Sequence, residues 1–199
     1  MLCATVPSVM LDPESFSAWM KILRSLPDAV LWLPAYSLQI AANLVREANA
    51  AGVNENRLLF AHRLSRAQSL ACLKHADLFL DTLRFNANLG LEDALRMGVP
   101  AITCAGNSMA SRLGGSMVRA AGLPDCVMES PQAYVAEALR LGRNPPALRQ
   151  LRQQLSAGKT AAPLFDLAAR VRDWETAWTT MTERSRAGLP PAAFDVAPA

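Results

Sequence analysis

The sequence predicts an α/β fold: a doubly wound parallel sheet of about five strands, with extra helices at the carboxyl end. Short apolar runs alternate along the chain with longer amphipathic stretches, which is the pattern of repeated strand–helix units. The runs are continuously apolar rather than alternating, as expected for strands that are covered by helices on both faces. The composition, 51% hydrophobic and 19% charged, supplies the apolar side chains that such a core requires.

Five short apolar runs are the expected strands. They span residues 2–6, 29–33, 57–61, 77–80 and 100–104. Each run is followed by a stretch with helical periodicity, so successive strands are expected to run parallel, joined by helical crossovers.

The expected helices are marked by capping residues as well as by periodicity. Asp12 is a suitable N-cap, and Pro13 occupies the first position of a helix whose apolar residues recur at helical spacing. Gly52 and Gly98 end the second and fourth helices. The remaining helices are expected as follows: 38–50, 66–75, 90–97, 108–121, 131–142, 145–157 and 164–186.

The length predicts one domain. The chain has 199 residues, against about 150 for an average domain. A compact chain of this mass exposes roughly 9,000 Å² of the roughly 31,000 Å² that its extended form exposes, so a core forms without disulfides or metals. We expect a single lobe over residues 1–187 and a flexible tail over 188–199, which is rich in Pro and Ala.

Charge and hydropathy exclude several function classes. The net charge is +3, and basic residues never form a run longer than a pair. No basic stripe interleaved with aromatic residues is found, so no nucleic-acid partner is expected. The longest apolar stretch, residues 29–36, is too short to cross a bilayer, so no membrane association is expected.

The four cysteines and two histidines do not predict a metal site. They are widely spaced, without a Cys-x-x-Cys pair or zinc-finger spacing. Reduced, buried thiols are typical of the cytoplasm, where we expect this protein to be located.

The loops after the strands are the expected binding region, because open parallel sheets bind ligands beyond the carboxyl ends of their strands. The Gly-x-Gly-x-x-Gly fingerprint of nicotinamide enzymes follows none of the strands. The segment 158–160 (GKT) lacks the earlier glycine of a phosphate-binding loop and follows a helix, so it predicts no such site.

The loop 81–90 is the best phosphate candidate, since it leaves a strand and enters a helix. Free N–H groups and the helix dipole favour an anion there, and Gly90 allows close backbone approach. The alternative is an ordinary loop with Asn88 as N-cap. Asp93, in the first helical turn, either accepts ribose hydroxyls or offsets the helix dipole.

A cluster of basic residues follows the third strand. His62, Arg63 and Arg66 lie within five positions. Arginine stacks on planar bases and pairs with phosphates, although a solvated surface cluster is the alternative.

Six segments in order resemble the carboxyl-terminal lobe of the O-linked N-acetylglucosamine transferase family, especially its bacterial members with tetratricopeptide repeats. The resemblance covers about residues 8–186. The segments are 28–33 (DAVLWL), 52–60 (GVNENRLLF), 75–82 (HADLFLDT), 93–95 (DAL) together with 98–100 (GVP), 110–112 (ASR) and 163–166 (PLFD).

The resemblance implies one Rossmann-like lobe of a glycosyltransferase-B fold. It implies transfer of N-acetylglucosamine from UDP-N-acetylglucosamine to a Ser or Thr hydroxyl, with inversion and without a metal or other cofactor. An amino-terminal catalytic lobe, tetratricopeptide repeats on another segment and a protein acceptor are the implied partners. The helix start at Asn88, Leu89 and Gly90 would face the diphosphate, Asp93 the ribose, and the loop around Leu64 and Arg66 the uracil.

The sequence departs from the family pattern at several of these positions. Asn88-Leu89-Gly90 stands where the family has His-Thr-Thr. Met10, Pro7 and Ser69 stand where it has a lysine, a glutamine and a histidine, respectively. Arg66 keeps a cation in place of a lysine. We expect Arg63 or Arg84 to compensate for the lost phosphate contacts. The alternative is a degenerate, non-catalytic lobe that acts as a nucleotide-sugar-binding or protein-interaction module.

Overall fold

The computed structural model describes residues 1–34, 37–61, 64–159 and 162–197. Six parallel strands form one sheet in the order β3-β2-β1-β4-β5-β6. The strands are β1 (Leu2–Cys3), β2 (Leu31–Pro34), β3 (Leu58–Ala61), β4 (Leu78–Leu80), β5 (Ala101–Cys104) and β6 (Val127–Met128). The predicted α/β fold with a doubly wound parallel sheet is confirmed.

The sixth strand is the difference from the expected number. Strand β6 has two residues, both only partly buried, and pairs with β5 at the edge of the sheet. So short a segment carries no periodicity of its own, and pairing with Thr103 and Cys104 of β5 defines it.

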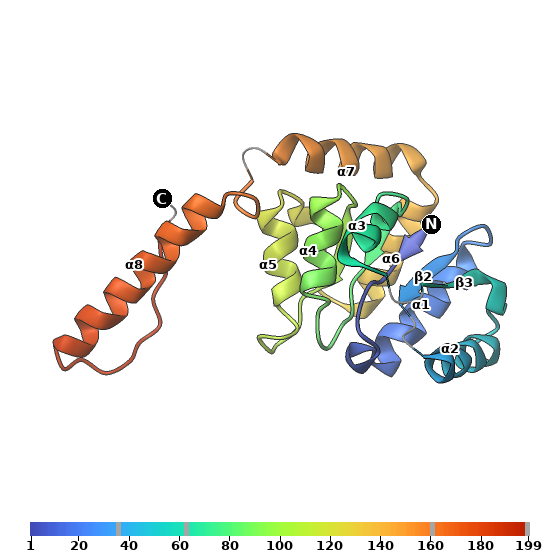
Figure 1. Cartoon of the computed structure of the whole chain (residues 1–199), viewed down its shortest axis with the longest axis horizontal. Coiled ribbons are helices and arrows are strands. Elements are labelled where there is room, and N and C mark those ends of the chain that lie inside the picture. Colours follow the sequence, from blue (N-terminus) through green and yellow to red (C-terminus); the bar gives the residue numbers. More distant parts are fainter. Residues whose placement is uncertain (35–36, 62–63, 160–161, 198–199) are drawn as a thin grey trace.

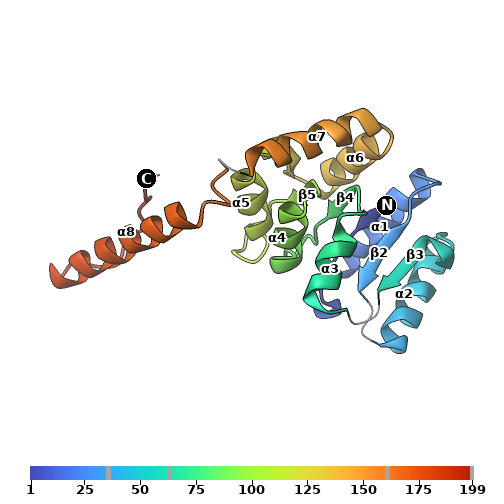
Figure 2. The same cartoon turned by 45° about the horizontal axis from the view of Figure 1, so that its top comes forward.

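The helices fall close to their expected positions. They are α1 (Pro13–Ser25), α2 (Leu38–Ala50), α3 (Arg66–Leu73), α4 (Leu89–Arg96), α5 (Leu113–Ala120), α6 (Pro131–Gly142), α7 (Pro145–Gly158) and α8 (Leu167–Arg186). Helix α1 packs against α6, whereas α3, α4 and α5 lie side by side in sequence order (Figures 1 and 2). Helices therefore cover both faces of the sheet.

Local capping explains where the helices begin. The Asp12 carboxylate accepts hydrogen bonds from the backbone N–H groups of Glu14 and Ser15, both at 3.0 Å, as its N-cap role predicts. Helix α5 begins five residues later than expected, because Ser108 and Ser111 bond to each other's backbone in a turn instead of capping a helix.

Helix α7 lies at the end of the sheet opposite the strands' carboxyl ends. Arg152 donates to the carbonyl of Ala76, just before β4, and Gln154 donates to the Gly122 carbonyl at 2.8 Å. Figures 1 and 2 show α7 running over α5. This placement leaves the carboxyl ends of the strands uncovered by α7.

Helix α8 extends away from the rest of the chain in both views (Figures 1 and 2). None of its residues is buried. The accessible surface of the protein is 11,218 Å², larger than the roughly 9,000 Å² expected for a compact chain of this mass. The projecting helix α8 explains why the accessible surface is larger than that of a compact chain.

The carboxyl-terminal residues 188–197 form neither helix nor strand. The expected flexibility of residues 188–199 and the domain boundary at 187 stay predictions. Among the described residues, no helix has both the length and the apolar character needed to cross a bilayer.

Candidate functional site

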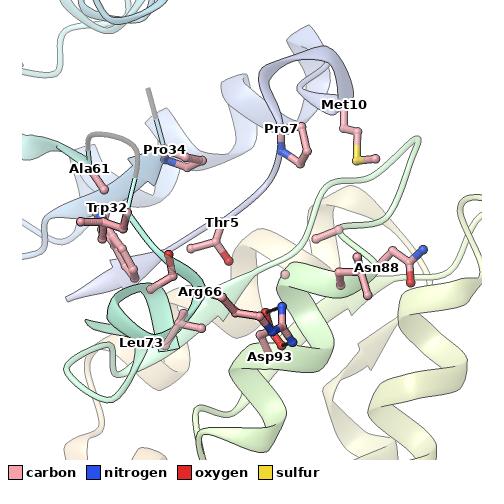
Figure 3. A pocket seen from close by; sticks show the side chains of 15 residues that line it. Thr5, Pro7, Met10, Trp32, Pro34, Ala61, Arg66, Leu73, Asn88 and Asp93 are labelled. Atoms are coloured by element: carbon pink, nitrogen blue, oxygen red, sulfur yellow. Dashed lines mark hydrogen bonds and ion pairs between the residues drawn. The ribbon is translucent and has the colours of Figure 1, made fainter. Parts of the chain in front are cut away.

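A cleft of about 420 Å³ opens at the carboxyl ends of β1, β2 and β3, beside the first turns of α3 and α4 (Figure 3). Strand β1 lies between β2 and β4, so the chain connections diverge to either side of it. This is the topological switch point, where doubly wound sheets hold their ligands. The lining residues are Thr5, Pro7, Met10, Trp32, Pro34, Ala61, Leu64, Arg66, Ser69, Leu73, Ala87, Asn88, Leu89, Gly90 and Asp93.

The α4 wall of the cleft consists of residues 87–90 and Asp93. Asn88 has a φ of 43°, a left-handed conformation that it alone adopts among the described non-glycine residues. Its side chain makes no capping hydrogen bond, although it occupies the N-cap position. The backbone N–H groups of Asn88 and Leu89 bond to no other described residue. They are free donors of the kind that bind anions at a helix start.

Gly90 brings α4 close to the end of β1. A Cβ at this position would lie 2.1 Å from the Thr5 carbonyl oxygen. The close backbone approach that was expected at Gly90 is therefore a contact between the backbones of Gly90 and Thr5. The buried Thr5 hydroxyl has no hydrogen-bond partner among the described residues.

The α3 wall of the cleft consists of Leu64 and the cleft-facing residues of α3. Ser65 and Gln68 form a capping box, in which the Gln68 Oε1 accepts from the Ser65 backbone at 2.9 Å. The helix therefore starts at Arg66, and this side chain reaches across to α4. Figure 3 shows Arg66 and Asp93 joined at the bottom of the view.

Arg66 and Asp93 form a two-pronged ion pair. The two terminal guanidinium nitrogens donate to the two carboxylate oxygens at 3.0 and 2.7 Å. The Asp93 side chain is 16% exposed and that of Arg66 is 67% exposed. A partly exposed carboxylate with unused lone pairs can accept hydroxyl donors, and the exposed guanidinium can contact a planar group.

The structure brings most of the predicted site residues to this cleft. Leu64, Arg66, Asn88, Leu89, Gly90 and Asp93 all line it. So do Pro7, Met10 and Ser69, the other positions at which the sequence departs from the family pattern. Arg66 is the one basic side chain among the described lining residues, and it is already paired with Asp93.

Arg63 and Arg84 were expected to compensate for the lost phosphate contacts, and the structure describes only one of them. Arg84 does not line the cleft; its side chain is 77% exposed and lies 3.9 Å from the Glu14 carboxylate. Arg63 lies outside the described residues. Within the described ranges, no three His, Cys, Asp or Glu side chains are arranged to hold a metal ion.

Several lining residues were not predicted from the sequence. These are Thr5, Trp32, Pro34, Ala61 and Leu73, whereas Ala87 falls within the predicted loop 81–90. Trp32, Pro34 and Ala61 lie in β2 and β3, whose carboxyl ends point toward the cleft. The sequence signal that could have indicated these residues is their position near the ends of predicted strands. It did not identify them, because the sequence does not show which strand ends lie together in the sheet.

The fold and the cleft define a Rossmann-like lobe with a cleft at the switch point of a parallel sheet, where doubly wound folds bind their ligands. Residues 2–174 match the family model described as Glycosyl transferase family 41. Since the match covers most of the chain, the chain belongs to this family. The resemblance inferred from the sequence is confirmed.

Curated relatives are named UDP-N-acetylglucosamine–peptide N-acetylglucosaminyltransferases. A protein from Caenorhabditis elegans is 29% identical over 90% of this chain. The probable transferase SEC from Arabidopsis thaliana is 30% identical over 94% of this chain. The chain spans only 16% and 19% of the lengths of these two proteins, respectively.

Solved structures support the same lobe assignment. A mutant of the O-GlcNAc transferase of Thermobaculum terrenum superposes with a TM-score of 0.85 at 32% identity. The superposition covers 90% of this chain and 35% of the transferase chain. The carboxyl-terminal domain of a Francisella tularensis group 1 glycosyltransferase shares the fold alone, with a TM-score of 0.59 at 13% identity over 80% of this chain and 83% of that one.

Proposed function

We propose that this chain is the donor-binding lobe of a glycosyltransferase that transfers N-acetylglucosamine from UDP-N-acetylglucosamine to a Ser or Thr hydroxyl of a protein. One observation carries the proposal. The positions assigned separately to diphosphate, ribose and uracil converge on a single cleft at the switch point of the sheet. The names of the curated relatives support the choice of donor and reaction.

The free N–H groups at the start of α4 would bind the diphosphate. Catalysis would then be electrostatic, because donors that are already oriented stabilise the charge that develops on the departing UDP. The proposal includes inversion at the sugar and no metal or further cofactor.

The opposite end of the nucleotide would lie between α3 and α4. The Asp93 carboxylate would accept the ribose hydroxyls, with Arg66 holding it in orientation through two hydrogen bonds. Arg66 and Leu64 would contact the uracil ring.

The remaining parts of the proposed enzyme lie outside this chain. Residues 1–187 would form the donor lobe, with residues 188–199 as its tail. An amino-terminal catalytic lobe, tetratricopeptide repeats and the protein acceptor would complete the machinery. The free cysteines support a reducing, cytoplasmic location.

A second candidate is a non-catalytic lobe that binds a nucleotide sugar or a protein. The chemistry of the cleft favours it in one respect. Pro7, Met10 and Leu89 present no hydrogen-bond donor side chain to a diphosphate, and the charge of Arg66 is offset by Asp93. Lost charge-assisted hydrogen bonds weaken binding by about 1.5–3 kcal/mol each.

Calorimetric titration of UDP into this chain tests the donor site. We expect micromolar binding that weakens by about ten- to a hundredfold in Asp93→Asn, since two hydroxyl contacts lose a charged acceptor. Glu92→Gln is the matched control. Glu92 is the neighbouring carboxylate on α4, but it pairs with Arg96 at 2.8 Å and does not line the cleft.

Failure to bind millimolar UDP would overturn the donor assignment for this chain. Equal weakening in both variants would show that the helix, rather than Asp93, is disturbed. To separate the two candidates, transfer from UDP-N-acetylglucosamine to a protein acceptor is measured with the donor lobe joined to an amino-terminal lobe. Binding without transfer would favour the non-catalytic candidate.

A further inference from the structure

Asp81 is a fully buried carboxylate that follows β4 and precedes the loop to α4. Its Oδ1 accepts the backbone N–H groups of Thr82 at 2.9 Å and Ala87 at 2.7 Å. Its Oδ2 accepts the hydroxyl of Thr103, in β5, at 2.6 Å. One side chain therefore bonds to both ends of the loop that leads into the cleft.

The same loop is tied to two further elements, α5 and α1. The buried Asn86 donates to the Thr82 carbonyl at 2.7 Å and accepts the Gly114 N–H, at the start of α5, at 2.9 Å. The Leu83 N–H donates to the Ser15 hydroxyl of α1 at 2.8 Å. These contacts fix the loop as a unit, with Asp81 at its base.

The contact between Asp81 and Ala87 ends directly beside the cleft. Ala87 precedes the left-handed Asn88, and its carbonyl accepts the Gly90 N–H at 3.0 Å. A left-handed non-glycine residue is unfavourable and persists only where its surroundings hold it. The orientation of the free Asn88 and Leu89 N–H groups therefore depends on how Ala87 is held.

The space around Asp81 is closely fitted. A Cβ at Gly114 would lie 2.2 Å from the Asp81 Oδ2, so α5 approaches the carboxylate at a glycine. The phenol of Tyr134, from α6, donates to the Asp81 backbone carbonyl at 2.9 Å and is a titratable side chain beside this residue, with the Cys104 thiol of β5 close to the same phenol. The side chains that bond to the carboxylate and to its loop from α1 and β5 are neutral hydroxyls, Ser15 and Thr103.

Burial makes the charge of Asp81 costly to keep. Desolvation raises the pKa of Asp81 from its ordinary value of 3.8 to about 6, against the opposing effect of its hydrogen bonds. At neutral pH the carboxylate is ionised although no cation among the described residues pairs with it. Stability alone would be served as well by a neutral amide of the same shape.

We propose that Asp81 is a positioning residue, whose ionised carboxylate holds the loop 81–88 so that the free N–H groups at the start of α4 face the nucleotide sugar. The inference rests on the proposed function for the identity of the ligand. The loop geometry itself does not depend on it.

The test is Asp81→Asn, titrated with UDP-N-acetylglucosamine, whose diphosphate diester does not titrate near neutral pH. The amide still accepts the two N–H groups, so the variant is expected to fold, but it lacks the charge that strengthens these bonds. We expect binding about tenfold weaker than wild type at pH 8, while the midpoint of urea unfolding does not fall. A residue needed only for folding would lower both.

The pH profile separates charge from shape. Wild-type affinity is expected to fall as the pH drops through about 6, toward that of Asp81→Asn, whose affinity should stay level. Asp77→Asn is the matched control, because Asp77 directly precedes β4, is 57% exposed and pairs with the chain's amino group. It should bind like wild type at both pH values.

Hydrogen exchange over residues 83–92 gives a readout without ligand. Asp81→Asn should exchange faster than wild type and Asp77→Asn. Unchanged exchange, or binding as tight as or tighter than wild type at pH 8, would overturn the positioning role. If wild type binds no UDP-N-acetylglucosamine, the proposed function fails, and exchange alone then decides whether Asp81 orders the loop.

Discussion

The α4 wall of the cleft rests on buried polar contacts, whereas the α3 wall is joined to it by an ion pair at the surface. Asp81, Asn86 and Thr103 are each 0% exposed, and they fix the loop that leads into α4. On the other side, Arg66 is 67% exposed and reaches Asp93 across the cleft. Buried hydrogen bonds cannot be replaced by water, but a solvated ion pair can.

This difference predicts unequal sensitivity to substitution. Changes that displace the backbone of the α4 wall should affect both stability and ligand binding strongly, whereas Asp81→Asn, which keeps its acceptor oxygen, should weaken binding alone. Changes on the α3 wall should leave stability nearly unaltered and tune affinity only. The three predictions below test this inequality, beginning with the largest effect.

Gly90→Ala is expected to have the largest effect, because its Cβ would lie 2.1 Å from the Thr5 backbone carbonyl. A backbone atom cannot move aside as a flexible side chain can, so we expect a loss of about 3 kcal/mol in unfolding free energy. UDP binding should become undetectable by calorimetry. Gly158→Ala is the control: it ends α7 with its nearest neighbours at 3.6 Å, and it should be neutral or slightly stabilising.

The stability of the α4 wall should depend on pH through Asp81. Its pKa is raised to about 6 from 3.8 in the unfolded chain, so the folded state takes up the proton first as the pH falls. When the pH is lowered from 7 to 4, the unfolding free energy of wild type relative to Asp81→Asn should rise by about 2–3 kcal/mol. This gain is lost when the pH rises again through 6. Urea unfolding of both proteins across this range measures the difference, and parallel curves would contradict it.

Arg66→Gln should change the unfolding free energy by only about 0.2–1 kcal/mol, since the pair it breaks is largely solvated. UDP affinity should fall severalfold, because Asp93 loses its partner and the uracil a contact. Arg140→Gln removes a comparable pair with Glu137 within α6, at 2.7 Å, and should leave affinity unchanged. A stability loss as large as that of Gly90→Ala would show that both walls are equally integral to the fold.

Local sequence signals predicted most of the secondary structure. The bounds of α2 and α6 agree with the expected 38–50 and 131–142 to the residue, because their caps Ser37 and Ser130 act on the backbone three residues on. Strand β6 was not predicted, because its two residues gain their strand geometry only from pairing with β5.

The candidate site was predicted only in part, because its local features are visible in the sequence and its long-range contacts are not. A helix start after a strand, with Asp93 close behind it, is visible within a dozen residues of sequence, although α4 begins one residue earlier than expected and its first turn therefore holds Glu92 and not Asp93. The ion pair between Asp93 and Arg66, which lies 27 positions earlier, is not visible in the sequence. The loop 81–90 was identified as a phosphate candidate, whereas the role of Asp81 at its base required the position of Thr103 in a neighbouring strand.

The sequence by itself therefore determined the α/β alternation, most of the helix starts and the end of the sheet at which a ligand would bind. Each depends on interactions over a few residues or on a general rule for parallel sheets. The tertiary structure decided the strand order, the partner of Gly90, the pairing across the cleft and the projection of α8. These depend on which distant segments pack together, and no local pattern records that choice.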